Sequence, residues 1–219
     1  MKQKKRVIKK ELAKKHFRVT IFGSARIKKG DTRFNQVKSL AKMLGEKGID
    51  IVTGGGPGLM QAASIGHNLG MKISKKESHS IGLLIKLPRE QKTAEFLNIK
   101  KEFSKFSNRL DDFMELSNVF VVAPGGIGTT LELFYTLQLI QVKQTCNVPV
   151  ILLGNMWAPL IKWLEKYPIK NKLMNKEDLN SVFLAKNSEE AMKMINKAYE
   201  HHKKGDKNIC LNYKRYKLY

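Results

Sequence analysis

The residues with the clearest potential for chemistry lie between positions 119 and 141. Val119–Ala123 is an apolar run rich in β-branched residues, typical of a buried parallel strand, and Pro124-Gly125-Gly126 ends it. A helix is expected from Gly128 onward, and its unpaired N–H groups beside the turn would favour a phosphate or another anion. Glu132 lies one turn into that helix, where the helix dipole favours an ionised carboxylate. The pattern predicts a phosphate site with an acidic group beside it.

A second glycine-rich turn repeats this arrangement. The expected strand Ile49–Thr53 runs into Gly54-Gly55-Gly56-Pro57-Gly58, and a helix is expected from Leu59 to Leu69, with Gly70 ending it. Tight turns need glycine with or without a ligand, so the repetition carries the inference: two such loops would share one crevice if their strands are neighbours. Neither loop has the GK[ST] ending of a P-loop or the spacing of a dinucleotide fingerprint, which argues against ATP hydrolysis and NAD.

Two other positions could contribute to such a crevice. Gly23-Ser24-Ala25-Arg26 directly follows the expected strand Arg18–Phe22, and its small residues leave room for a ligand. Arg109 lies near the start of the expected helix Lys105–Leu116. Taken alone, that arginine is explained more simply by a surface ion pair with Asp111 or Asp112 than by catalysis.

The elements that must position these residues alternate between strand and helix. This alternation predicts an α/β fold with a mostly parallel sheet. Further strands are expected at Ile81–Ile85, Ile99–Phe103, Pro149–Leu153 and Val182–Ala185. Further helices are expected at 33–47, capped by Asp31 or Thr32 and ended by Gly48, at Met156–Lys166, and from Ser188 as cap to Lys203.

Length and composition limit the functional classes. The 219 residues suffice for one substantial domain, and the two cysteines, Cys146 and Cys210, have no spacing typical of a metal or disulfide framework. Histidines and carboxylates show no metal-binding spacing either, so we expect no metal and no cofactor. No apolar run is long enough to cross a bilayer and no signal-peptide pattern is present. The expectation is a cytoplasmic protein without a membrane partner.

The charge is concentrated at the ends of the chain. Lys and Arg number 41 against 19 Asp and Glu, a net charge of +22, of which residues 1–18 carry +8 and residues 203–219 carry +5. We therefore divide the chain into a basic extension, 1–17, a domain, 18–204, and a basic tail, 205–219. Residues 1–15 have the spacing of a short amphipathic helix. Lysine-rich solvated surface explains the charge most simply, and nucleic-acid binding through the tails is the less favoured alternative.

Four pieces of sequence together resemble the LONELY GUY family, long mislabelled as lysine decarboxylases. Pro124–Glu132, PGGIGTTLE, resembles the family's PGGxGTxxE motif, and Arg109 stands where the family places its catalytic arginine. Gly54–Met60 resembles the GGGxxGLM loop, and Phe22-Gly23-Ser24 the turn after the first strand. The resemblance spans roughly residues 18 to 154. The chain departs from the family pattern at Leu110, Asp111, Asp112 and Leu131.

The resemblance implies a Rossmann-like three-layer fold, a homodimer, and hydrolysis of the N-glycosidic bond of a nucleoside 5′-monophosphate to free base and ribose 5-phosphate. The substrate would be AMP or, as in plants and some microbes, a cytokinin riboside 5′-monophosphate. By the same resemblance Arg109 and Glu132 are the catalytic pair. The residues implied for substrate and phosphate binding are Gly23, Ser24, Gly54, Gly55, Gly56, Gly125, Gly126, Gly128 and Thr129.

Chemistry is consistent with these roles. Breaking a ribosyl C–N bond builds positive charge on the sugar, which the Glu132 carboxylate could stabilise, and negative charge on the base, which Arg109 could offset. The same fold also resembles molybdenum-cofactor carrier proteins, which bind a phosphorylated pterin without hydrolysing a nucleotide. A non-hydrolytic carrier is therefore the alternative function.

Overall fold

A computed structural model describes residues 16–86 and 92–205 of the chain. The amphipathic helix expected over 1–15 and nearly all of the basic tail 205–219 lie outside the described residues.

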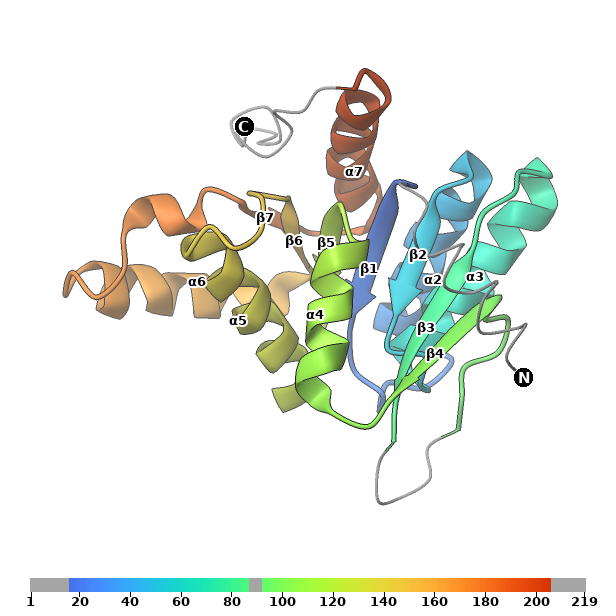
Figure 1. Cartoon of the computed structure of the whole chain (residues 1–219), viewed down its shortest axis with the longest axis horizontal. Coiled ribbons are helices and arrows are strands. Elements are labelled where there is room, and N and C mark those ends of the chain that lie inside the picture. Colours follow the sequence, from blue (N-terminus) through green and yellow to red (C-terminus); the bar gives the residue numbers. More distant parts are fainter. Residues whose placement is uncertain (1–15, 87–91, 206–219) are drawn as a thin grey trace.

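Within the described residues, seven strands form one parallel sheet (Figure 1). Their order is β4-β3-β2-β1-β5-β6-β7, so the chain winds outward from β1 in one direction and then from β5 in the other. This confirms the expected α/β fold. The strands are β1 (Arg18–Phe22), β2 (Asp50–Thr53), β3 (Ser80–Ile85), β4 (Ile99–Phe103), β5 (Val119–Val122), β6 (Val150–Leu153) and β7 (Val182–Ala185).

Helices cover both faces of the sheet and make a three-layer structure (Figure 1). Helices α2 (Thr32–Lys47), α3 (Leu59–Ser74) and α7 (Ser188–Lys203) pack on one face, and α4 (Phe106–Leu116), α5 (Ile127–Gln141) and α6 (Ala158–Leu164) on the other. Successive strand residues supply the two cores: Ile21 packs with the first group and Phe22 with the second. No helix in the described part of the chain is long and apolar enough to cross a membrane.

Helix ends follow the local sequence closely. The Asp31 side chain accepts a hydrogen bond of 2.8 Å from the Arg33 N–H at the start of α2, and Gly48, at φ 73°, ends that helix as expected. The cap expected at Ser188 is wrong by one residue. Asn187 is extended and accepts a hydrogen bond from the Glu190 N–H, whereas Ser188 is already helical.

The expected end of α3 at Gly70 is also wrong, because the helix continues to Ser74. A Cβ atom on Gly70 would lie 2.0 Å from the Lys42 carbonyl oxygen, and one on Gly66 would lie 2.0 Å from the Lys38 carbonyl oxygen. These glycines therefore allow α2 and α3 to pack backbone against backbone. Glycine at such a position serves close helix contact and not helix termination.

The region expected as a helix over Met156–Lys166 is divided. A 3-10 turn, η1 (Asn155–Trp157), precedes α6, and a π-helical segment, η2 (Glu165–Ile169), that contains Pro168 follows it. A 3-10 turn, η3 (Lys176–Leu179), lies between η2 and β7. Of the two tryptophans expected in the core or at a dimer contact, Trp157 is buried and Trp163 is 49% exposed.

Candidate functional site

Three turns meet at the carboxyl ends of the central strands. The turns after β2 and β5 are not direct neighbours, because β1 lies between these strands and its own turn joins them. The Ser24 N–H donates to the Pro124 carbonyl at 3.1 Å, and the Leu59 N–H donates to the Ser24 carbonyl at 2.9 Å. Gly58 has φ 70°, and a Cβ atom there would lie 2.3 Å from the Ser24 oxygen. The turn after β2 therefore needs glycine at position 58 to approach the turn after β1 so closely.

A cavity of about 830 Å³ opens between these turns. Its volume is within the range of sites for small molecules and cofactors. The lining includes Gly23, Ser24, Gly54, Gly56, Arg109, Gly126, Gly128, Thr129 and Glu132 from the sequence prediction. The structure thus brings together residues from four separate segments of the chain.

Arg109 is held in the cavity wall by contacts on several sides. Its Nε donates to the Leu83 carbonyl of β3 at 2.7 Å, and its guanidinium lies 5.2 Å from the centre of the Phe113 ring. A Cβ atom on Gly54 would lie 2.2 Å from the arginine's terminal nitrogen. Glycine at position 54 therefore makes room for the guanidinium, which is a packing reason for this residue beyond any ligand contact.

Glu132 lies beside Arg109 in the lining of the cavity. The distance from the Arg109 Nη1 to the Glu132 Oε1 is 3.8 Å, and the two side chains are 9% and 13% exposed. Burial raises the pKa of Glu132 to about 7, and the positive charge of Arg109 opposes part of that rise. The expected stabilisation of the ionised form by the helix dipole is not what dominates. Glu132 is the sixth residue of α5, beyond the first turn where the dipole acts most strongly, and desolvation outweighs it.

The remaining predicted residues divide into those that border open space and those that support the turns. A Cβ atom on Gly126 or Gly128 would meet nothing within 4 Å, so a ligand can approach the start of α5 there. Gly125 packs directly against the Thr129 side chain, and Gly55 packs against Gly82. Neither Gly55 nor Gly125 is part of the lining, so both support the turns from behind.

The surface ion pair considered for Arg109 is not the arrangement found. Asp112 pairs with Lys101, and Asp111 accepts a hydrogen bond of 2.5 Å from the Tyr135 hydroxyl. The two aspartates that depart from the family pattern thus fix α4 to β4 and to α5. They leave the Arg109 guanidinium facing Glu132.

Sequence reasoning missed several lining residues. Arg26 and Lys92 add positive charge around the cavity, whereas Lys86 is paired with Glu102 of the same lining at 3.6 Å. Phe106 adds an exposed aromatic ring. Lys86 directly follows β3, and both Lys86 and Lys92 lie in a segment with no periodic pattern and no motif. The sequence therefore contains no signal that would place them at the cavity. Arg26 was part of the first turn, but no property of the sequence distinguished it from the other basic residues.

The raised pKa of Glu132 has a measurable effect on folding. Between about pH 4.5 and pH 7 the unfolded chain loses the Glu132 proton while the folded chain retains it, so stability falls as pH rises through this interval. In Glu132→Gln this contribution is absent. We therefore expect the free energy of unfolding of the variant, relative to that of wild type, to increase by up to about 3 kcal/mol from pH 5 to pH 8, at roughly 1.4 kcal/mol per pKa unit.

Urea unfolding of both proteins at several pH values measures this difference, and comparison with wild type cancels the other titrating groups. A difference that is constant with pH would show that Glu132 has an ordinary pKa.

Comparisons with known proteins indicate the family and the fold of the chain. The family model described as "Possible lysine decarboxylase" matches residues 62–195. A protein of Escherichia coli K12 named pyrimidine/purine nucleotide 5′-monophosphate nucleosidase is 28% identical over 131 residues, covering 57% of this chain. This chain spans 28% of the length of that relative, and the same holds for the matching protein of Escherichia coli O157:H7.

Solved structures share the fold. The molybdenum cofactor binding protein of Rippkaea orientalis superposes with a TM-score of 0.60 at 19% identity, over 84% of this chain and 97% of the other. The molybdenum cofactor carrier protein of Chlamydomonas reinhardtii gives 0.60 at 21% identity, over 85% and 99%. Identity this low shows the fold alone. The family match covers more than half of the sequence, and the chain therefore belongs to the LONELY GUY family, whose model carries the lysine decarboxylase description.

Proposed function

We propose that the protein hydrolyses the N-glycosidic bond of a nucleoside 5′-monophosphate and releases the free base and ribose 5-phosphate. The observation that carries this proposal is the facing of Arg109 and Glu132, at 3.8 Å, in a cavity bordered by the glycine turns. The nucleosidase name of the Escherichia coli relatives supports the same reaction class. AMP is the first substrate to test, and cytokinin riboside 5′-monophosphate is the second.

In this proposal the phosphate lies at the start of α5. The first N–H groups of a helix have no partner inside the helix, and here they belong to Ile127, Gly128 and Thr129. The open space at Gly126 and Gly128 allows an anion to come close, and Arg26 and Lys92 add attraction around the cavity. Binding energy from the phosphate would then position the glycosidic bond, so adenosine should be a much poorer substrate than AMP.

The base and sugar would lie toward Arg109 and Glu132. The ionised carboxylate stabilises positive charge on the ribose, holds its hydroxyls, or takes a proton from the attacking water. The guanidinium offsets negative charge that develops on the leaving base. Neither role calls for a metal ion or cofactor.

The direct test is to incubate the purified protein with AMP, adenosine and other nucleoside monophosphates and to separate the products by chromatography. Free adenine from AMP, with little from adenosine, is the expected result. If no monophosphate gives a free base, the hydrolase proposal is wrong. Should the protein instead retain a phosphorylated pterin through purification, it would be a carrier like the molybdenum cofactor carrier protein of Chlamydomonas reinhardtii.

We also infer that the protein is a homodimer, from apolar side chains exposed along α5, the helix that carries Glu132. Ile127, Leu131 and Phe134 recur every three or four residues along α5 and are 88%, 47% and 37% exposed. A stripe of this kind marks a contact surface. Sedimentation equilibrium should give twice the chain mass for wild type and a smaller mass for Phe134→Glu. A monomeric wild type at micromolar concentration would contradict the dimer.

A further inference from the structure

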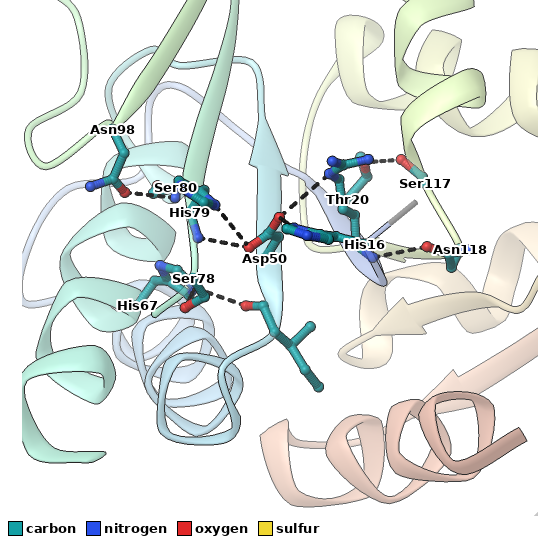
Figure 2. A network of polar contacts seen from close by, with 12 residues as sticks. His16, Thr20, Asp50, His67, Ser78, His79, Ser80, Asn98, Ser117 and Asn118 are labelled. Carbon is teal, nitrogen blue, oxygen red and sulfur yellow. Dashed lines mark hydrogen bonds and ion pairs between the residues drawn. The ribbon is translucent and has the colours of Figure 1, made fainter. Parts of the chain in front are cut away.

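Three side chains with metal-binding atoms meet at the amino ends of the strands, the sheet edge opposite the cavity. Asp50 begins β2, His79 immediately precedes β3, and His16 lies two residues before β1. Figure 2 shows the two imidazole rings on either side of the Asp50 carboxylate. The rings are nearly parallel, at 19°, with their centres 6.5 Å apart. The three residues come from separate segments that the parallel register brings side by side.

The distances suit coordination of one ion. The His16 Nδ1 lies 3.4 Å from one Asp50 oxygen, and the His79 Nδ1 lies 3.4 Å from the other. Zinc bonds of about 2.0 to 2.2 Å at tetrahedral angles separate neighbouring ligand atoms by about 3.3 to 3.5 Å. All three ligand atoms lie within 4.8 Å of one another, so small rotations of the imidazoles would close the remaining gap.

The carboxylate is built into the fold and not left at the surface. Its side chain is 4% exposed, and the backbone N–H of His79 donates to its Oδ1 at 2.8 Å. The Arg18 Nε lies 3.5 Å from its Oδ2 and supplies a balancing positive charge. The two imidazoles are 44% and 32% exposed, which leaves a route by which an ion can enter.

We propose that His16, Asp50 and His79 form a binding site for a divalent transition metal ion such as Zn²⁺. Two imidazoles and one carboxylate suit zinc, cobalt and nickel, whereas Mg²⁺ and Ca²⁺ prefer sites made only of oxygen atoms. This revises the expectation of no metal. The ligands are separated by 34 and 29 residues, so no sequence motif joins them.

The ion would have a structural role. It would connect the residues leading into β1, β2 and β3, at the sheet edge away from Arg109 and Glu132. An ion that binds only the folded chain stabilises it by mass action. The positive charge of Arg18 weakens the attraction of the site for a cation. Zinc should therefore bind only when its concentration exceeds that of competing chelators.

The test uses the full chain without an affinity tag, stripped with EDTA and titrated calorimetrically with ZnCl₂. We expect one zinc ion per chain and a higher melting temperature with zinc. His16→Ala and His79→Ala should each weaken binding by about tenfold or more, since even loss of residues behind the ligands usually costs that much. His201→Ala, in α7, is the matched histidine control and should bind as wild type does. MgCl₂ should give no stoichiometric binding.

His16→Ala keeps the test independent of folding, because this half-exposed side chain precedes the first strand. Zinc binding that survives both His16→Ala and His79→Ala, or that is lost in His201→Ala, would overturn the proposal. So would a wild-type chain that takes up no zinc in the calorimeter. AMP hydrolysis should be unchanged in His16→Ala. The metal site and the proposed hydrolase activity are therefore tested separately, and either proposal can be wrong while the other holds.

Discussion

Replacing Glu132 with Gln should reduce kcat/KM for AMP by about 10²- to 10⁴-fold, the usual contribution of a positioned acid or base. Glutamine keeps the size and one acceptor oxygen of the side chain but cannot carry the negative charge that the developing sugar cation requires. Because burial already disfavours that charge in the folded protein, the substitution should not weaken the fold. A large loss of activity without loss of stability is the result that distinguishes a catalytic carboxylate from a structural one.

The measurement is adenine release under single-turnover and steady-state conditions, with AMP above and below its KM. Glu46→Gln, in the partly exposed ion pair with Lys42 on α2, is a matched control and should keep wild-type activity. Glu132→Asp keeps the charge on a shorter side chain and should recover part of the activity. If Glu132→Gln releases adenine as fast as wild type, the carboxylate has no catalytic role and only the binding part of the proposal remains.

The sequence sufficed for those parts of the site that local patterns determine. The turns at Gly54–Gly58 and Pro124–Gly128 are readable because a strand must stop and a helix must start there, and each event has its own residue types. The pairing of Arg109 with Glu132 came from the family resemblance. From spacing alone, an ion pair with Asp111 or Asp112 was the simpler explanation, and only the fold shows that both aspartates are engaged elsewhere.

The rest depends on contacts between distant segments. Gly70 reads as a helix end from its neighbours, but the backbone of α2 lies against it, so the glycine is used for packing. The acidity of Glu132 depends on how much water its surroundings exclude, which no local pattern contains. The grouping of His16, Asp50 and His79 likewise follows from the register of three strands.

The second large effect concerns Arg109 and the pH dependence of activity. If the ionised form of Glu132 is the active one, kcat/KM for AMP in wild type should rise about tenfold per pH unit below pH 7 and level off above it, because kcat/KM reports groups of the free enzyme. Arg109 holds the pKa of Glu132 below the value that burial alone would give. Arg109→Gln should therefore move the rise to higher pH, in addition to lowering the plateau by about 10²-fold or more.

Arg109→Lys separates these two effects. A lysine keeps a positive charge near Glu132 and should keep the midpoint close to that of wild type, but it lacks the planar group that donates to the Leu83 carbonyl and should lose part of the plateau. Profiles of kcat/KM between pH 5 and pH 9 for the three proteins give both quantities. If the midpoint of the pH profile is the same in Arg109→Gln as in wild type, the rise in kcat/KM reports the titration of a group other than Glu132. Activity that falls as pH rises through 7 would mean that protonated Glu132 is the active form, acting as a proton donor to the base.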